Sequence, residues 1–121
     1  MRSPVTPSLF TPKLVETIAF YQETLGFVQT GIHHDESEIP IWTELSLNQA
    51  KIWFFSSPLM EPATPQLSGL IYIFVEHVDQ MAQTLAGKVN FEWGPETQDY
   101  GLREVAIKDC NGYYLVFAQD D

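Results

Sequence analysis

The sequence predicts an α+β fold of two βαβββ halves, with sheets curving around a central hollow. Segments with strand and helix periodicity occur in the same order on both sides of a proline-containing middle stretch. Trp42-Thr43-Glu44-Leu45 also lies sixty positions before Leu102-Arg103-Glu104-Val105, as a duplication would produce. One such half leaves a sheet face uncovered, so we expect two halves to pair and to form a hollow suited to a ligand.

The first half, about 1–57, is expected to contain one helix and four strands. A strand over Val5–Phe10 precedes Thr11-Pro12, which supplies an N-cap candidate and a proline at the first helical position. Apolar residues at helical spacing continue to Leu25, and Gly26 suits the left-handed position beyond a helix end. Asn48 can adopt the positive φ of the last turn. The remaining predicted strands are Phe27–Ile32, Ile41–Leu47 and Ala50–Phe55.

The second half, about 69–121, repeats the pattern after a linker of about 58–68 that contains three prolines and neither periodicity. We interpret residues 1–121 as one domain of two halves. Asp109–Gly112 is predicted to be the last turn. The predicted elements are a strand at Leu70–Val75, a helix at Val78–Ala86, and strands at Val89–Trp93, Leu102–Lys108 and Tyr113–Ala118.

Composition excludes several classes of protein. Sixteen acidic residues against six Lys and Arg give a net charge of −10, which would repel nucleic acid and anionic membranes. The longest apolar run, Leu70–Val75, is far shorter than a membrane span. The single cysteine and the polar start of the chain indicate a cytoplasmic protein without a disulfide framework.

Two motifs resemble those of the vicinal oxygen chelate superfamily, which includes glyoxalases, extradiol dioxygenases and bleomycin-resistance proteins. The first is Thr17–Tyr21 followed by Leu25–Phe27, and the second is Tyr100–Glu104 leading into Asp109–Gly112. The second is similar to the Gly-x-Arg-Glu and Asp-Pro-x-Gly pattern of the resistance-type members, with Cys110 in place of proline. The resemblance implies the two-half fold and leaves the activity open.

The resemblance also implies where metal-dependent members would place their ligands. Aligning the chain on these motifs brings Thr6, Phe54, Leu70 and Val116 to the four positions. Zinc, iron and related metals need imidazole, carboxylate or thiolate donors, which these side chains lack. We therefore expect no metal, no cofactor and no catalytic residue, and we favour a binding protein over an enzyme.

Strand alternation from those four positions predicts which side chains face the hollow. Arg103 is expected to be the main polar anchor for a ligand, with a salt bridge to a structural carboxylate as the alternative. Trp42 and Trp93 are expected at the rim, with core or dimer packing as the alternative. With even-length turns, Glu44 and Glu104 face the other way; a bulge would reverse this. The predicted ligand-binding residues are Ser8, Phe10, Phe54, Tyr72, Arg103, Tyr114, Trp42 and Trp93.

Other candidate side chains favour structural roles. His33-His34-Asp35-Glu36, with Glu38, alternates between the faces of an extended segment and is typical of a solvated loop rather than a metal site. Cys110 has no residue at a defined spacing to activate it and is interpreted as part of a turn.

The function that follows is a metal-free small-molecule-binding protein of the glyoxalase and bleomycin-resistance type, which sequesters a cationic or aromatic antibiotic-like ligand. The alternative is a metal-dependent lyase or dioxygenase of the same superfamily that recruits Glu44, Glu104 and a histidine. The resemblance further implies a homodimer, because relatives commonly assemble their hollows between two chains.

Overall fold

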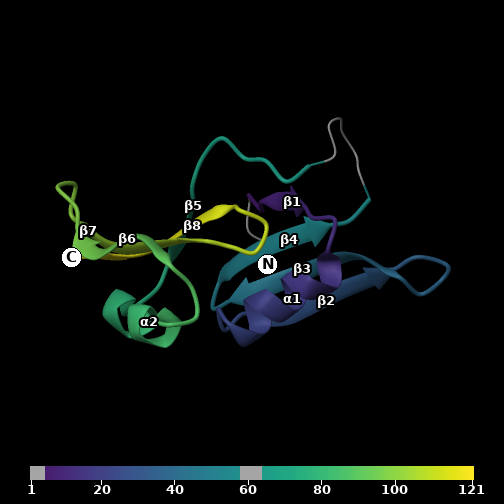
Figure 1. Ribbon diagram of the computed structural model, residues 1–121, viewed down its shortest axis with the longest axis horizontal. Helices are drawn as coiled ribbons and strands as arrows, with labels where there is room; N and C mark the ends of the chain where they lie inside the picture. Colours follow the sequence, from purple (N-terminus) through teal and green to yellow (C-terminus); the bar gives the residue numbers. More distant parts are fainter. Residues whose placement is uncertain (1–4, 58–63) are drawn as a thin grey trace. The chain divides into compact units, whose positions relative to one another are not determined.

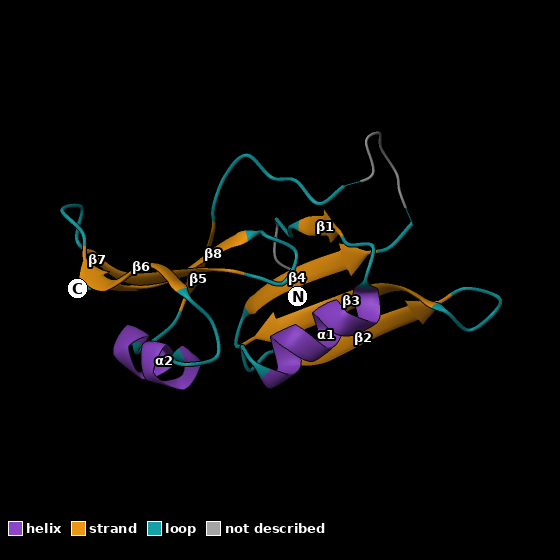
Figure 2. Ribbon diagram, in the orientation of Figure 1, coloured by secondary structure: helices purple, strands orange, loops and turns teal. Residues whose placement is uncertain are grey.

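The computed structural model describes residues 5–57 and 64–121 and contains two four-stranded mixed sheets, each accompanied by one helix (Figures 1 and 2). The predicted α+β class and the repeated strand–helix–strand–strand–strand order are confirmed. The chain divides into two compact units, Met1–Pro65 and Gln66–Asp121, so the boundary falls inside the predicted linker. Pro58 and Pro62 of that linker lie outside the described residues, while residues 64–70 are neither helix nor strand.

In the first unit the strands follow the order β1-β4-β3-β2, with β1 parallel to β4 and the other pairs antiparallel. The helix begins later than predicted, with Lys13 rather than Thr11 at the N-cap. The Thr11 hydroxyl nevertheless accepts the Lys13 N–H at 3.1 Å. Gly26 and Asn48 have the expected positive φ. The elements are β1 (Ser8–Phe10), α1 (Leu14–Glu23), β2 (Val28–His34), β3 (Pro40–Leu47) and β4 (Ala50–Phe55).

The core of the first unit lies between α1 and one face of its sheet. Tyr21 of α1 is fully buried and meets Phe54 of β4 edge-on, with ring centroids 5.2 Å apart. The register pairs Phe54 with Thr43 and Ile52 with Leu45, so these four side chains share the face under α1. Phe54 therefore belongs to the core beneath the helix, where burial of such a ring contributes roughly 1.5–3 kcal/mol.

In the second unit the strand order is β5-β8-β7-β6, the same arrangement as in the first. The strand predicted at Val89–Trp93 begins and ends later, and its pairing with β7 has an irregular register on both sides of Trp93. Gly94 follows with a φ of 81°, and a Cβ there would collide with the backbone oxygen of Glu104. The elements are β5 (Ile71–Phe74), α2 (Val78–Leu85), β6 (Phe91–Thr97), β7 (Leu102–Lys108) and β8 (Tyr114–Asp120).

The faces of the second sheet differ from the prediction. Lys108 pairs with Tyr114, so five residues separate the strands instead of an even number. The wider loop is held by Asp109, whose Oδ1 accepts the N–H groups of Asn111 and Tyr113 at 2.8 and 2.9 Å. This odd length places Arg103 on the α2 face and Glu104 on the opposite face, which reverses the expected assignment.

Within the described residues, both helices are too short to span a membrane; the longer, α1, has 10 residues.

Candidate functional site

The predicted ligand-binding residues lie on four different sheet faces in the structure. Phe54 lies under α1, and Arg103 lies on the α2 face, so neither is on the face where the prediction placed it beside the others. In the first unit the register places three of them on the face opposite α1: Ser8, exposed on β1; Phe10, buried against Phe55 with centroids 5.8 Å apart; and Trp42, edge-on to Trp53. In the second unit Tyr72, Trp93 and Tyr114 come together on the face opposite α2.

Glu104 is the centre of the face opposite α2, although the sequence assigned it to the other side. One carboxylate oxygen, Oε1, accepts the indole N–H of Trp93 at 2.9 Å and the phenol of Tyr100 at 2.9 Å. The Tyr72 phenol donates to the same oxygen at 3.4 Å. Only 1 % of Glu104 is exposed to solvent. Three aromatic side chains therefore fix the orientation of a buried carboxylate.

The second oxygen of that carboxylate, Oε2, is buried and has no hydrogen-bond partner among the described residues. Within residues 5–57 and 64–121, no lysine, arginine or histidine forms an ion pair with Glu104. A buried charge without a counter-ion is costly, and most buried polar atoms in proteins have a partner. Glu104 Oε2 is thus a buried acceptor without a donor among the described residues.

The Glu104 cluster, defined as Glu104, Tyr72, Trp93, Tyr100 and Tyr114, is otherwise aromatic. Trp93 stacks on Tyr114 with centroids 6.5 Å apart and an interplanar angle of 25°. The hydrogen bond with Tyr72, the burial of its hydroxyl and the nearby Glu104 all raise the pKa of Tyr100, so its phenol stays protonated at neutral pH and remains a donor. Flat π surfaces beside a carboxylate suit a planar or cationic ligand.

A matching glutamate lies in the first unit. Glu44 of β3 accepts the Trp53 indole N–H at Oε2, 2.8 Å away, and the Thr30 hydroxyl at Oε1, also 2.8 Å away. Unlike Glu104, it also has an intramolecular cation, because Lys51 Nζ lies 3.7 Å from Oε1. Both of its oxygens have partners within the unit.

The strand registers show what replaces that lysine in the second unit. Ser46, two residues beyond Glu44, pairs with Lys51, whereas Ala106, two residues beyond Glu104, pairs with Val116. Val116 therefore occupies the position of Lys51, and it is fully buried. The second unit therefore has the corresponding glutamate but not the cation, and its indole donor, Trp93, comes from β6, whereas Trp53 comes from β4.

Arg103 forms the salt bridge that the sequence left open as its alternative. Its Nε and one terminal nitrogen donate to the two carboxylate oxygens of Asp79 in α2, at 3.0 and 2.9 Å. The hydrogen bond from Arg103 holds the pKa of Asp79 below its ordinary value. Arg103 thus ties α2 to β7.

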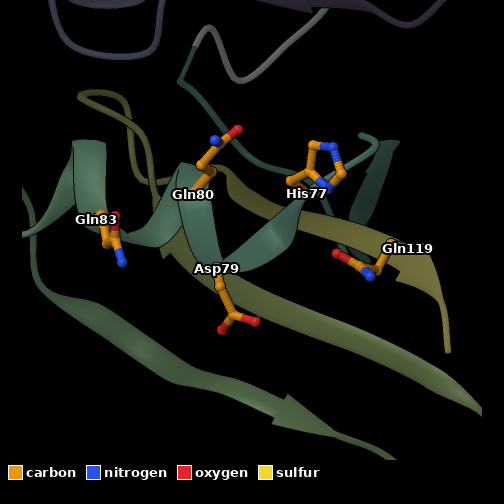
Figure 3. Close-up of a pocket in the computed structure, with 5 residues that line it drawn as sticks. All are labelled: His77, Asp79, Gln80, Gln83 and Gln119. Atoms are coloured by element: carbon orange, nitrogen blue, oxygen red, sulfur yellow. The ribbon is translucent and has the colours of Figure 1, made fainter.

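A polar hollow of about 410 Å³ lies beside the start of α2 (Figure 3). Two of the side chains that line this hollow already have structural partners. Gln119 Oε1 accepts the Val78 N–H at 2.6 Å, and the Asp79 carboxylate accepts a hydrogen bond from Arg103. We therefore regard the Glu104 cluster as the stronger candidate. The hollow is lined by His77, Asp79, Gln80, Gln83 and Gln119.

The residues at the positions implied for a metal do not fit one. Phe54 and Val116 are fully buried hydrocarbon side chains, and Leu70 is 47 % exposed with no donor atom. Across residues 5–57 and 64–121, no group of three or more His, Cys, Asp and Glu residues is placed to hold a metal ion. His33 and His34 are exposed residues at the end of β2 rather than part of a loop, and in the turn that follows the Asp35 carboxylate accepts the N–H groups of Ser37 and Ile39. No reaction step through a metal follows from these side chains.

Sequence reasoning named Glu104 only as a metal ligand of the alternative enzyme, and it missed Tyr100. The repeat itself carried a signal, since Glu44 and Glu104 lie at corresponding positions in the two halves. The loop length after Lys108, which decides the face of Glu104, depends on side-chain hydrogen bonds of Asp109 and could not be deduced from alternation alone.

Solved structures with the same fold cover nearly the whole chain. TioX from Micromonospora sp. ML1 has a TM-score of 0.78 at 13 % identity, covering 98 % of this chain and 97 % of its own. A superfamily member from Sphaerobacter thermophilus DSM 20745 has a TM-score of 0.76 at 19 % identity, covering 99 % and 98 %. Lactoylglutathione lyase from Agrobacterium tumefaciens has a TM-score of 0.69 at 14 % identity, covering 97 % and 92 %.

These low identities show a shared fold and nothing more. A comparison with curated proteins found no significant match. The family model of the Glyoxalase/Bleomycin resistance protein/Dioxygenase superfamily, however, matches residues 4–117. The match includes both sequence motifs and every helix and strand as far as the middle of β8, so the chain belongs to this superfamily.

Proposed function

We propose that this protein binds a small, partly aromatic and positively charged molecule on the face opposite α2, and that it sequesters the molecule without a metal. The observation that carries the proposal is the Glu104 cluster, a buried carboxylate with one unpartnered oxygen among aromatic rings. Such a site offers one directional acceptor and broad apolar contact, the usual composition of a small-molecule site. An antibiotic-like compound with a ring system and a basic nitrogen has the complementary chemistry.

The charge of the chain supports a cationic ligand. A net charge of −10 on 121 residues attracts cations over long range and raises their association rate. The same charge disfavours phosphorylated or carboxylated ligands. Long-range attraction and the local acceptor at Glu104 therefore act in the same direction.

The metal-dependent lyase or dioxygenase is less well supported. Its candidate ligands, Glu44 and Glu104, each accept an indole N–H, and neither belongs to a metal-type cluster among the described residues. Lactoylglutathione lyase from Agrobacterium tumefaciens shares the fold at 14 % identity, which does not transfer its activity.

The proposal includes a cytoplasmic homodimer. The single cysteine suits a reducing compartment. The edge strands are β1 and β2 in the first sheet and β5 and β6 in the second. A second copy of the chain could cover such edges. Light scattering on the purified protein should give twice the monomer mass of 13.8 kDa; the monomer mass would contradict the dimer.

Thermal unfolding with a panel of aromatic amines, amidines and neutral aromatic compounds tests the binding function. We expect cationic members to raise the melting temperature and to change tryptophan fluorescence, because Trp93 lies in the proposed site. Metal analysis of protein purified without chelators accompanies the screen. Unchanged melting temperatures throughout the panel would contradict the binding function, and a stoichiometric transition metal would favour the enzyme.

A further inference from the structure

We propose that Glu104 determines the charge of the ligand, its Oε2 accepting a hydrogen bond from a protonated nitrogen attached to an aromatic ring. This inference rests on the proposed function and assigns its specificity to one atom. The class of ligand is an aromatic amidinium, guanidinium or primary ammonium. A neutral aromatic compound of the same shape would find the same rings but would leave the carboxylate without a cation.

The first argument is the unequal use of the two Glu104 oxygens. Oε1 accepts donors from Trp93, Tyr100 and Tyr72, while Oε2 is buried without a partner among the described residues. Neutral donors satisfy hydrogen-bonding capacity but do not neutralise the charge of a buried carboxylate. A ligand cation at Oε2 supplies both a hydrogen bond and the missing charge.

The second argument is the contrast with Glu44, which shows how this fold satisfies the same glutamate internally. Lys51 Nζ lies 3.7 Å from Glu44 Oε1 and donates to Ser46 Oγ at 3.0 Å. Its positional counterpart in the second unit, Val116, has no charge. The ligand nitrogen would therefore take the role that a lysine fills in the first unit.

The third argument is that nearby side chains hold the site in place before a ligand arrives. Trp93 stacks on Tyr114, and the Tyr114 ring is covered by Lys108, whose Nζ is 5.2 Å from the ring centroid. Lys108 is thus engaged with the aromatic ring and does not form an ion pair with Glu104. Because Oε1 is held by three donors, the carboxylate is oriented before a ligand arrives, and binding at the buried Oε2 requires movement of the side chains that cover it.

Paired probes of equal shape test the inference. Benzamidine carries an amidinium and benzamide a neutral amide, and their dissociation constants would be measured by NMR titration. We expect benzamidine to bind the protein at least about tenfold more tightly than benzamide. The preference should disappear in E104Q, which keeps the shape and the Oε1 acceptor, and should persist in E44Q, the matched control in the first unit.

The indole N–H resonances of the unmodified protein give a second readout that needs no change at Glu104. Trp93 and Trp53 each donate to one of the two glutamates, so benzamidine should shift the Trp93 signal and leave the Trp53 signal in place. Resonances would be assigned with the single variants W93F and W53F. This arm decides the question even if E104Q does not fold.

The outcomes separate the inference from the function beneath it. Equal affinity for the two probes, or a preference lost in E44Q and kept in E104Q, would overturn the role of Glu104 while leaving the binding function standing. A shift of the Trp53 signal alone would do the same. If neither probe binds at about 10 mM, well above the dissociation constants of simple fragments that fit, the proposed function fails as well.

Discussion

Glu44 and Glu104 hold corresponding positions in the two sheets, and both accept an indole N–H. They differ in whether a cation lies beside the carboxylate. Glu44 has Lys51 as an internal cation, and Glu104 has only neutral donors among the described residues. The duplicated scaffold therefore repeats the carboxylate, while the residue on the next strand that pairs two positions beyond it is lysine in the first unit and valine in the second. The first unit therefore pairs its glutamate with a cation, whereas the second leaves Glu104 Oε2 without a partner among the described residues.

The helix-covered faces of the two sheets are more alike, apart from Arg103 on the α2 face, whose counterpart under α1 is the buried Thr43. Under α1 the buried side chains include Tyr21, Phe54 and Leu45, and the α2 face buries Leu85 and Phe117. Both faces are closed by apolar packing, which tolerates exchange of one hydrophobic side chain for another of similar volume. The contrast between Glu44 and Glu104 therefore lies on the faces opposite the helices, while the Arg103–Asp79 ion pair lies on the α2 face.

The largest expected effect separates core from site. F54A should lower the free energy of unfolding by about 3–5 kcal/mol, because it leaves a cavity beneath α1. Y72A, on the face opposite α2 with 37 % of Tyr72 exposed, should cost about 1 kcal/mol or less. Urea unfolding of both variants measures the difference. An F54A protein as stable as the original would return Phe54 to the ligand site predicted from its strand position.

The sequence was sufficient for the elements but not for the faces. The bounds of α1, β3 and β4 could be predicted within a few residues, because the signals are local. These signals are the helical spacing, the glycine after the helix and the turn at Asn48. The two-residue turn at Asn48-Gln49 also carried strand alternation correctly from β3 to β4. Alternation failed between β7 and β8, where Asp109 holds a five-residue loop. Consequently Arg103 was predicted as the anchor, and Glu104 beside it was not.

The next prediction compares the two glutamates directly. E44Q should lower the free energy of unfolding by about 0.5–1 kcal/mol, because it leaves Lys51 without its carboxylate. E104Q should leave stability unchanged or raise it by about 1 kcal/mol, because it removes an unpaired buried charge. Denaturant unfolding without ligand measures both. A larger loss in E104Q than in E44Q would show that the hydrogen bonds to the charged Oε1, or a counter-ion, outweigh the cost of the buried charge.

A smaller effect is expected when the first unit is made to resemble the second. K51M keeps most of the side-chain volume but removes the cation, so Glu44 should lose its ion pair at a cost of about 0.5 kcal/mol. The difference in stability between K51M and the original protein should shrink at high salt, because salt screens the partly exposed ion pair. The Lys51 and Glu44 side chains are 30 % and 17 % exposed. Equal stability of K51M and the original at low salt would mean that Lys51 contributes no charge compensation.

The smallest effect concerns the Arg103–Asp79 pair on the α2 face, which is exposed and should contribute little. The pKa of Asp79 is lower in the folded chain than its ordinary value of 3.8, owing first to the hydrogen bond from Arg103. The pair therefore stabilises the fold above about pH 4, and this contribution is lost as pH falls through the folded pKa. D79N should be slightly less stable than the original at neutral pH and equally stable in acid, with D99N, at an exposed aspartate, as the control. Melting curves between about pH 2 and 7 measure the gap, and a gap that persists at the acid end would assign the effect to packing of α2 instead of charge.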